Sequence, residues 1–121
     1  MAATTDYSLF HFHPVGLYAL KDLMNIQRPS IIEVHREVTG PSIEELFPWL
    51  KLVQERKALL ISWCPDAPGK VPLEAEIRYA LRNLSPRGLC LHFAAKDAEE
   101  GKSIIRLVNK VLREDMKRNT N

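Results

Sequence analysis

Apolar positions along the chain follow two alternating patterns. Short apolar or β-branched runs are separated by longer segments in which apolar residues recur every third or fourth position. The short runs indicate strands at 7–13, 30–38, 57–64 and 88–95. The longer segments indicate amphipathic helices at 15–25, 41–56, 72–84 and about 98–118. This alternation is typical of βαβ units and predicts an α/β protein with a mainly parallel sheet.

Local signals mark the faces and ends of these elements. Ser42 and Glu45 form a capping box for the second helix, and Asp97 and Glu100 form a cap for the last one. Pro48 should interrupt the second helix or delay its start. Residues 57–64 are apolar almost throughout, so we expect this strand to be central and buried on both faces.

These elements predict a three-layer, flavodoxin-like α/β fold, shortened at its last βα unit. We expect about four parallel strands in the order 2-1-3-4, with helices on both faces. The length of 121 residues, with 45% apolar and 26% charged residues, suits one domain, residues 1–121, around one core.

Charge and composition limit the classes of partner and the cellular location that the sequence indicates. The 17 basic and 15 acidic residues are interspersed and give a net charge of +2, so neither nucleic acid nor an anionic membrane is indicated. A signal peptide is not evident, and apolar runs stay well short of the ~18 residues of a membrane span, so we expect a cytoplasmic protein. Cys64 and Cys90 lie in apolar strands and should be reduced and buried.

Three segments resemble receiver domains of NarL- and LuxR-type response regulators. "HPVGLYALKDLMNIQRPSIIEVHREVTG" is similar to the start of such a domain. "KALLISWCPDAPG" is similar to its third strand and the loop that follows. "LCLHFAAKDAEE" is similar to its fourth strand and the next helix start. The resemblance covers roughly residues 8–100 and implies the CheY-like fold, in which one Asp is phosphorylated with the help of Mg²⁺.

The residues that carry receiver chemistry are replaced here. His11 and Phe12 stand where the resemblance places the acidic pair that holds Mg²⁺. The phospho-acceptor position falls on Ile61 or Ser62, and the Thr position falls on Ala94. A fifth strand with its Lys is not evident. The resemblance therefore implies a pseudo-receiver, a non-enzymatic signalling module that works without phosphorylation and without cofactor or metal.

Such a module would act by binding a protein partner or a second copy of itself. Without a fifth strand, residues 88–95 form an open sheet edge, and the apolar stripe of the last helix is wider than one sheet face requires. The predicted partner or homodimer interface comprises Leu89, Leu91, Phe93, Ile104, Ile105, Val108, Val111 and Leu112.

The histidines support an alternative, a small metal- or cysteine-dependent enzyme using His11, His13 and Cys64. His11 and His13 are two residues apart on a strand, so they share a face at a spacing found in metal sites. A third ligand would come from His35, His92 or Cys64. Histidines spread singly over apolar strands are more often packed or partly exposed residues than a site, and that interpretation is preferred here.

Two further interpretations concern the regulator class and the loop after the third strand. An anti-anti-sigma-like regulator would have a similar strand and helix plan, although no serine-containing switch loop is evident. Asp66 lies in the Pro- and Gly-rich loop, where it is expected to form a turn rather than to bind metal.

Overall fold

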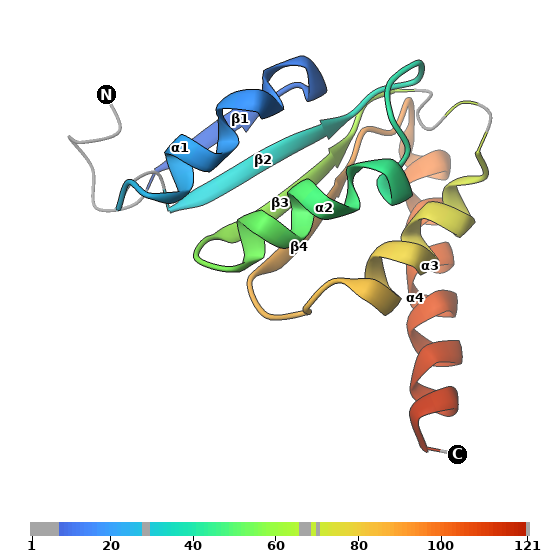
Figure 1. Ribbon diagram of the computed structural model, residues 1–121. Coiled ribbons are helices and arrows are strands. Elements are labelled where there is room, and N and C mark those ends of the chain that lie inside the picture. The colour runs from blue at the N-terminus through green and yellow to red at the C-terminus, as the bar shows by residue number, and fades with distance from the viewer. Residues whose placement is uncertain (1–7, 28–29, 66–68, 70, 121) are drawn as a thin grey trace.

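Strands and helices alternate along the whole of the described chain (Figure 1). The computed structural model describes residues 8–27, 30–65, 69 and 71–120. The strands are β1 (Leu9–Phe12), β2 (Ile31–Arg36), β3 (Ala58–Trp63) and β4 (Leu89–Phe93). The helices are the 3-10 helix η2 (Pro14–Ala19), α1 (Leu20–Met24), α2 (Ile43–Gln54), α3 (Leu73–Asn83) and α4 (Ala98–Thr120). The predicted α/β fold with a parallel sheet is confirmed.

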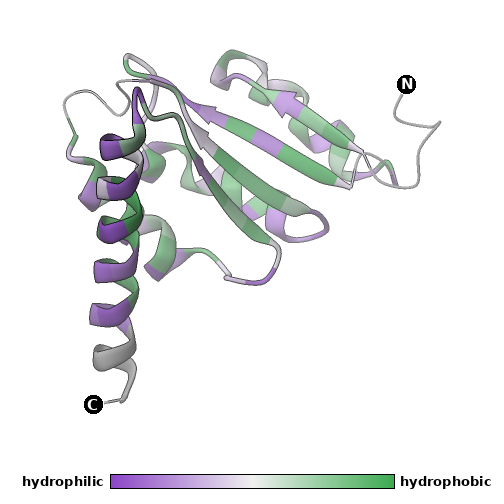
Figure 2. Cartoon of the chain, turned by 180° about the vertical axis from the view of Figure 1, so that it is seen from behind, coloured by the Kyte–Doolittle hydropathy of each residue, from purple (hydrophilic) through white to green (hydrophobic). Residues whose placement is uncertain are grey.

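The order of the strands differs from the prediction. They follow chain order, β1-β2-β3-β4, so the expected order 2-1-3-4 is wrong, and β2 separates β1 from β3. In Figure 1, α1, α2 and α3 lie on the same side of the sheet. The view from behind in Figure 2 shows the strands in front of them, with α4 standing beside the sheet. One face of the sheet is therefore left uncovered by the described helices, where two covered faces were expected.

The direction of winding explains this difference. A right-handed connection between parallel strands places its helix on a face set by the direction in which the chain steps across the sheet. A doubly wound sheet reverses that direction once and so covers both faces. Here all three connections step in the same direction. The helices therefore gather on one face.

One hydrophobic core joins the covered face of the sheet to the helices. The predicted apolar stripe of α2 is buried in it: Ile43, Leu46, Leu50 and Val53. The predicted capping box of Ser42 and Glu45 is present. The helix α2 begins directly after Ser42 and continues through Pro48, so the interruption or late start expected from Pro48 does not occur. As expected, β3 is the most buried strand, although Leu60 faces the uncovered side and is only half-buried.

The first helical segment is tighter than predicted. The sequence suggested one α-helix over residues 15–25, whereas the chain forms a 3-10 helix and then one short α-helix. Its apolar face is nevertheless the predicted one, because Leu17, Leu20 and Met24 are buried. Gly16 lies against the ring of Phe12, and a Cβ there would be 3.3 Å from that ring.

The last helix, α4, packs mainly on α3. Asp97 caps it as predicted, accepting the N–H of Glu100 at 2.8 Å. In the described part of the chain, three ion pairs join the two helices: Arg78 to Glu114 at 2.6 Å, Arg82 to Asp115 at 3.0 Å and Lys110 to Glu74 at 3.3 Å. None of the described helices combines the length and the apolar character needed to cross a membrane.

A buried carboxylate connects the elements that meet at the carboxyl ends of β2 and β3. Both oxygens of Glu76, on α3, accept from Nε of Arg36 at 2.9 Å, at the end of β2. Glu76 also accepts from the Trp63 indole at 2.9 Å and from the Ile43 backbone N–H at 3.0 Å. The side chains of Arg36 and Glu76 are each 2% exposed. Removing one partner of such a pair leaves an uncompensated buried charge.

We therefore expect Glu76→Ala to lower the free energy of unfolding by about 3–5 kcal/mol. Glu74→Ala is the matched control, because Glu74 lies on the same helix but pairs with Arg78 and Lys110 at the surface. Surface pairs contribute little, so its effect should be much smaller. Urea unfolding followed by tryptophan fluorescence measures both, and equal effects of the two substitutions would contradict this role for Glu76.

Candidate metal centre

The uncovered face of the sheet carries all four histidines of the chain. Strand register aligns its outward side chains in two rows: His11, Glu33, Leu60 and Cys90, then His35, Ser62 and His92. His13 follows β1 directly and contacts His11. Figure 2 looks onto this face, where hydrophilic and hydrophobic segments alternate along β2.

Two histidine–glutamate pairs orient the first two imidazole rings. Nδ1 of His11 donates to Oε1 of Glu33 at 2.7 Å, and Nδ1 of His13 donates to Oε1 of Glu37 at 2.5 Å. A carboxylate can only accept, so each Nδ1 carries a proton, and a neutral ring in this tautomer has a lone pair on Nε2. These two Nε2 atoms lie 3.1 Å apart. Facing lone pairs at this distance repel unless a proton or a metal cation lies between them.

His35 contributes a third ring to this pair. Its centroid lies 4.0 Å from that of His11 and 4.9 Å from that of His13. One ring nitrogen from each of the three histidines falls within 4.8 Å of the others. Nδ1 of His35 contacts Sγ of Cys64 at 3.1 Å, and its Nε2 is 3.7 Å from Oε2 of Glu33. All three Nδ1 atoms thus contact an orienting side chain. The Nε2 atoms of His11 and His13 face each other, and Nε2 of His35 also lies near Glu33.

Burial sets the protonation of His35 and Cys64. Desolvation, followed by the nearby His11, lowers the pKa of His35, so this ring stays neutral, as a metal ligand must be. Desolvation, followed by Glu37 and Glu33, raises the pKa of the Cys64 thiol. The thiol is therefore protonated near neutral pH, which makes Cys64 a poor nucleophile.

Three imidazole nitrogens on a partly exposed face suit a transition metal. In a tetrahedral zinc site with bonds of ~2.0–2.1 Å, two ligand nitrogens lie about 3.4 Å apart. The two Nε2 atoms of His11 and His13 are already close to that separation, at 3.1 Å. Metal-bound histidines usually donate their other N–H to a carboxylate or a carbonyl, as His11 and His13 do to glutamates.

The sequence predicted part of this arrangement. The spacing of His11 and His13 indicated one shared face, and His35, His92 and Cys64 were the three candidates for a third ligand. The structure brings His35 to the pair. His92 lies two strands from β2 and contacts Ser62 Oγ at 2.9 Å, whereas Cys64 contacts His35 from outside the three rings. The histidines of this cluster are in contact, so they are not the separately packed residues that the sequence favoured.

The two glutamates were missed by the sequence analysis. Glu33, His35 and Glu37 alternate along β2 and its extension, so all three side chains point to one face. That alternation was present in the sequence. It would have indicated a sheet with one polar, uncovered face.

The cysteines also differ from expectation. Both are free, as predicted, but Cys90 is exposed and Cys64 is half-buried, so the prediction that both are buried is wrong. The cause is again the order of the strands. Cys90 points to the uncovered face from the edge strand β4.

The positions to which the resemblance assigned receiver roles do not form one site. His11 and Ser62 point to the uncovered face, whereas Phe12 and Ile61 are buried in the core and Ala94 follows β4. The 2-1-3-4 order that the resemblance implies would place β1 beside β3. Because β2 lies between them, the ends of β1 and β3 are not neighbours.

The predicted interface residues also separate into groups. Those that pack against the core are Leu89, Leu91 and Phe93. On α4, Val111 is buried, and Ile104 and Val108 are half-buried. Ile105 and Leu112 remain exposed, at 62% and 41%. The expected continuous surface of strand and helix is therefore reduced to a stripe on α4.

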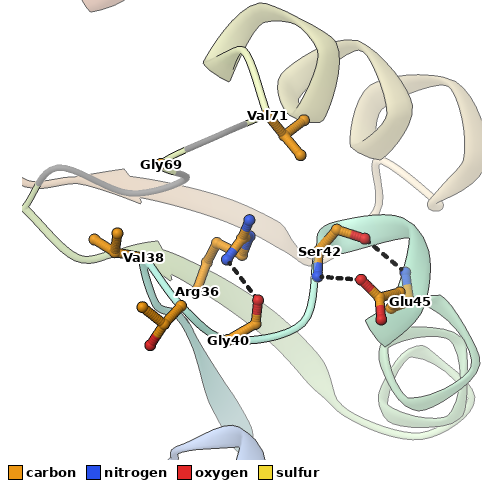
Figure 3. A pocket seen from close by; sticks show the side chains of 8 residues that line it. Arg36, Val38, Gly40, Ser42, Glu45, Gly69 and Val71 are labelled. Carbon is orange, nitrogen blue, oxygen red and sulfur yellow. Dashed lines mark hydrogen bonds between the residues drawn. The ribbon is translucent and has the colours of Figure 1, made fainter.

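A cavity of about 470 Å³ lies at the carboxyl end of β2 (Figure 3). Hydrogen bonds join several of its lining residues: Arg36 donates to the Gly40 carbonyl at 3.4 Å, and Ser42 and Glu45 form the capping box. We place no function there. Asp66, the predicted turn residue of the neighbouring loop, lies outside the described residues.

Comparison with known proteins finds no family model, no curated protein and no solved structure that matches the chain. The candidate metal centre therefore rests on its own geometry.

The two cysteines should differ in reactivity. We expect iodoacetamide at pH 7.5 to alkylate Cys90 before Cys64, because Cys90 is exposed and Cys64 is half-buried with a raised pKa. Peptide mass spectrometry at short reaction times measures both sites. Faster alkylation of Cys64 would show that its thiolate is more available than its burial and the nearby charges of Glu37 and Glu33 imply.

Proposed function

We propose that the protein binds a divalent transition metal, zinc foremost, through Nε2 of His11, His13 and His35. One observation carries the proposal: the Nε2 atoms of His11 and His13 lie 3.1 Å apart, while glutamates accept the protons of both Nδ1 atoms. A cation between the two Nε2 atoms would be attracted by both nitrogens. His35 supplies a third nitrogen within reach.

The type of ligand defines the type of metal. Imidazole suits Zn²⁺, Cu²⁺ and Ni²⁺, whereas Mg²⁺ and Ca²⁺ prefer sets of oxygen ligands. Three protein ligands leave one tetrahedral position open, an arrangement typical of zinc sites that hold a water or an external ligand. Of the metal- and cysteine-dependent alternatives, the metal is favoured, because Cys64 stays protonated beside His35.

The position of the site supports binding from solution. It lies on the uncovered face, with the His11 and His13 side chains 44% and 53% exposed. A metal ion can therefore reach the three nitrogens without opening the core. The two free cysteines are in keeping with the reducing cytoplasm that the sequence suggested, and we propose that location.

Isothermal titration with ZnCl₂ tests the proposal on the purified chain. One zinc should bind per chain, and His35→Ala should weaken binding by more than the roughly 10–100-fold that loss of an orienting partner costs. Glu37→Ala should fall within that range, because it removes the acceptor of His13 Nδ1 but no ligand.

His92→Ala is the matched control, since His92 lies on the same face but outside the cluster. It should bind zinc as the original chain does. If it weakens binding as much as His35→Ala, the histidines act as a diffuse surface rather than as a site. A chain that binds no zinc contradicts the proposal directly.

As a second candidate function, we propose the partner or homodimer binding that the receiver resemblance implies. The exposed Ile105 and Leu112 favour it, because they lie seven residues apart on one face of α4, the spacing of a helix–helix seam. Val108 lies between them on the same side and is half-buried. Val111, on the same helix, is buried, whereas Ile105 and Leu112 are exposed.

Ile105→Glu tests this second function without disturbing the core. If the stripe binds a second copy, sedimentation velocity should show a concentration-dependent dimer that this substitution converts to monomer. Val111→Glu, at a buried position of the same helix, should instead reduce folding, which circular dichroism reports. A monomer at every concentration would exclude the homodimer.

A further inference from the structure

The edge strand β1 exposes three of its four residues. It has four residues and pairs only with β2. Leu9 and Phe10 are 46% and 42% exposed, and Phe12 is the one residue of this strand that is buried. Segments with few buried contacts open locally at a lower free energy than the core does. β1 therefore has the features of a strand that can separate from the sheet while the rest stays folded.

The proposed metal ligands come from both sides of this weak junction. His11 and His13 belong to β1 and the residue that follows it, and His35 belongs to β2. The orienting contacts cross the same junction, from His11 to Glu33 and from His13 to Glu37. The complete set of three nitrogens exists only while β1 is paired with β2.

We infer that metal binding holds β1 on the sheet, and that without metal β1 opens separately from the core. This inference rests on the proposed metal site. A ligand that binds only the closed form shifts the equilibrium toward it by a factor of one plus the ratio of free ligand to its dissociation constant. At a free zinc concentration 100 times the dissociation constant, opening of β1 should become about 100-fold rarer.

The consequence of opening is exposure of the β2 edge. β2 alternates half-buried and buried residues along Ile31–Arg36, and its side toward β1 would lose its backbone partners. Such an edge can pair with another extended segment. Metal bound at the junction would keep this edge closed.

Hydrogen exchange read by mass spectrometry tests the inference on the whole chain, with and without ZnCl₂. Without metal, peptides covering β1 should exchange faster than those covering β3, the most buried strand. With zinc at 100 times its dissociation constant, exchange in β1 should slow by about 100-fold. His92→Ala should behave as the original chain does.

The His35→Ala variant distinguishes zinc that bridges β1 and β2 from zinc that binds on the β1 side alone. It keeps His11 and His13 as a weak ligand pair on one side of the junction but removes the ligand from β2. Zinc should then leave β1 exchange unchanged, even at concentrations that saturate the remaining pair. Protection of β1 in this variant would overturn the bridging role.

The other outcomes distinguish this inference from the metal site itself. If β1 exchanges as slowly as β3 without metal, separate opening does not occur and the inference is wrong, while the metal site stands. If titration shows zinc bound and β1 exchange does not change, the inference also fails alone. If no zinc binds, both fail together.

Discussion

The constraint on which this molecule depends is the single direction of its winding. Each connection steps to the next strand on the same side, so the order is β1-β2-β3-β4 and α1, α2 and α3 share one face. The sheet then has one face in the core and one face outside it. Parallel sheets are usually covered on both faces. Here the uncovered face carries polar side chains that a doubly covered sheet would have to bury.

That uncovered face brings the histidines together. In a parallel sheet in register, side chains two residues apart on one strand meet those of the next strand, about 4.8 Å away. Glu33 and Glu37 alternate with His35 on β2 and its extension, and they fix the protons of His11 and His13. The Nε2 atoms of His11 and His13 then face each other at 3.1 Å. In the proposed function, a cation between them would bind both nitrogens.

On the covered side of the sheet, the buried carboxylate of Glu76 connects several elements. It joins Arg36 at the end of β2 to Trp63 at the end of β3 and to the first turn of α2. These contacts lie on the covered face, opposite His35 of β2. Along β2, residues that point into the protein interior, such as Arg36, thus alternate with residues that face the proposed site, such as His35.

Much of the local structure could be predicted from sequence, because it depends on neighbours along the chain. The capping box at Ser42, the apolar stripe of α2 and the positions of the strands follow from spacing alone. The strand order could not be predicted in this way. Periodicity identifies the buried side of an element, but it does not say on which side of a strand the next strand is placed. The apolar run around Leu60 made β3 look doubly covered, although Leu60 faces the uncovered side.

The candidate site was predicted in the same partial way. The spacing of His11 and His13 gave one pair of ligands, because it is local. The choice of His35 over His92 needed the order of the strands, which places β2 and not β4 beside β1. The roles of Glu33 and Glu37 needed the register between β1 and β2.

X-ray absorption at the zinc edge tests the central claim most directly, because it reports the ligands of the bound ion. The account predicts three imidazole nitrogens at ~2.0–2.1 Å and one further light ligand in a four-coordinate site. It also predicts that His35→Ala loses one imidazole from the spectrum while His92→Ala loses none. A six-coordinate shell of oxygens, or a spectrum that the three histidines do not affect, would contradict it.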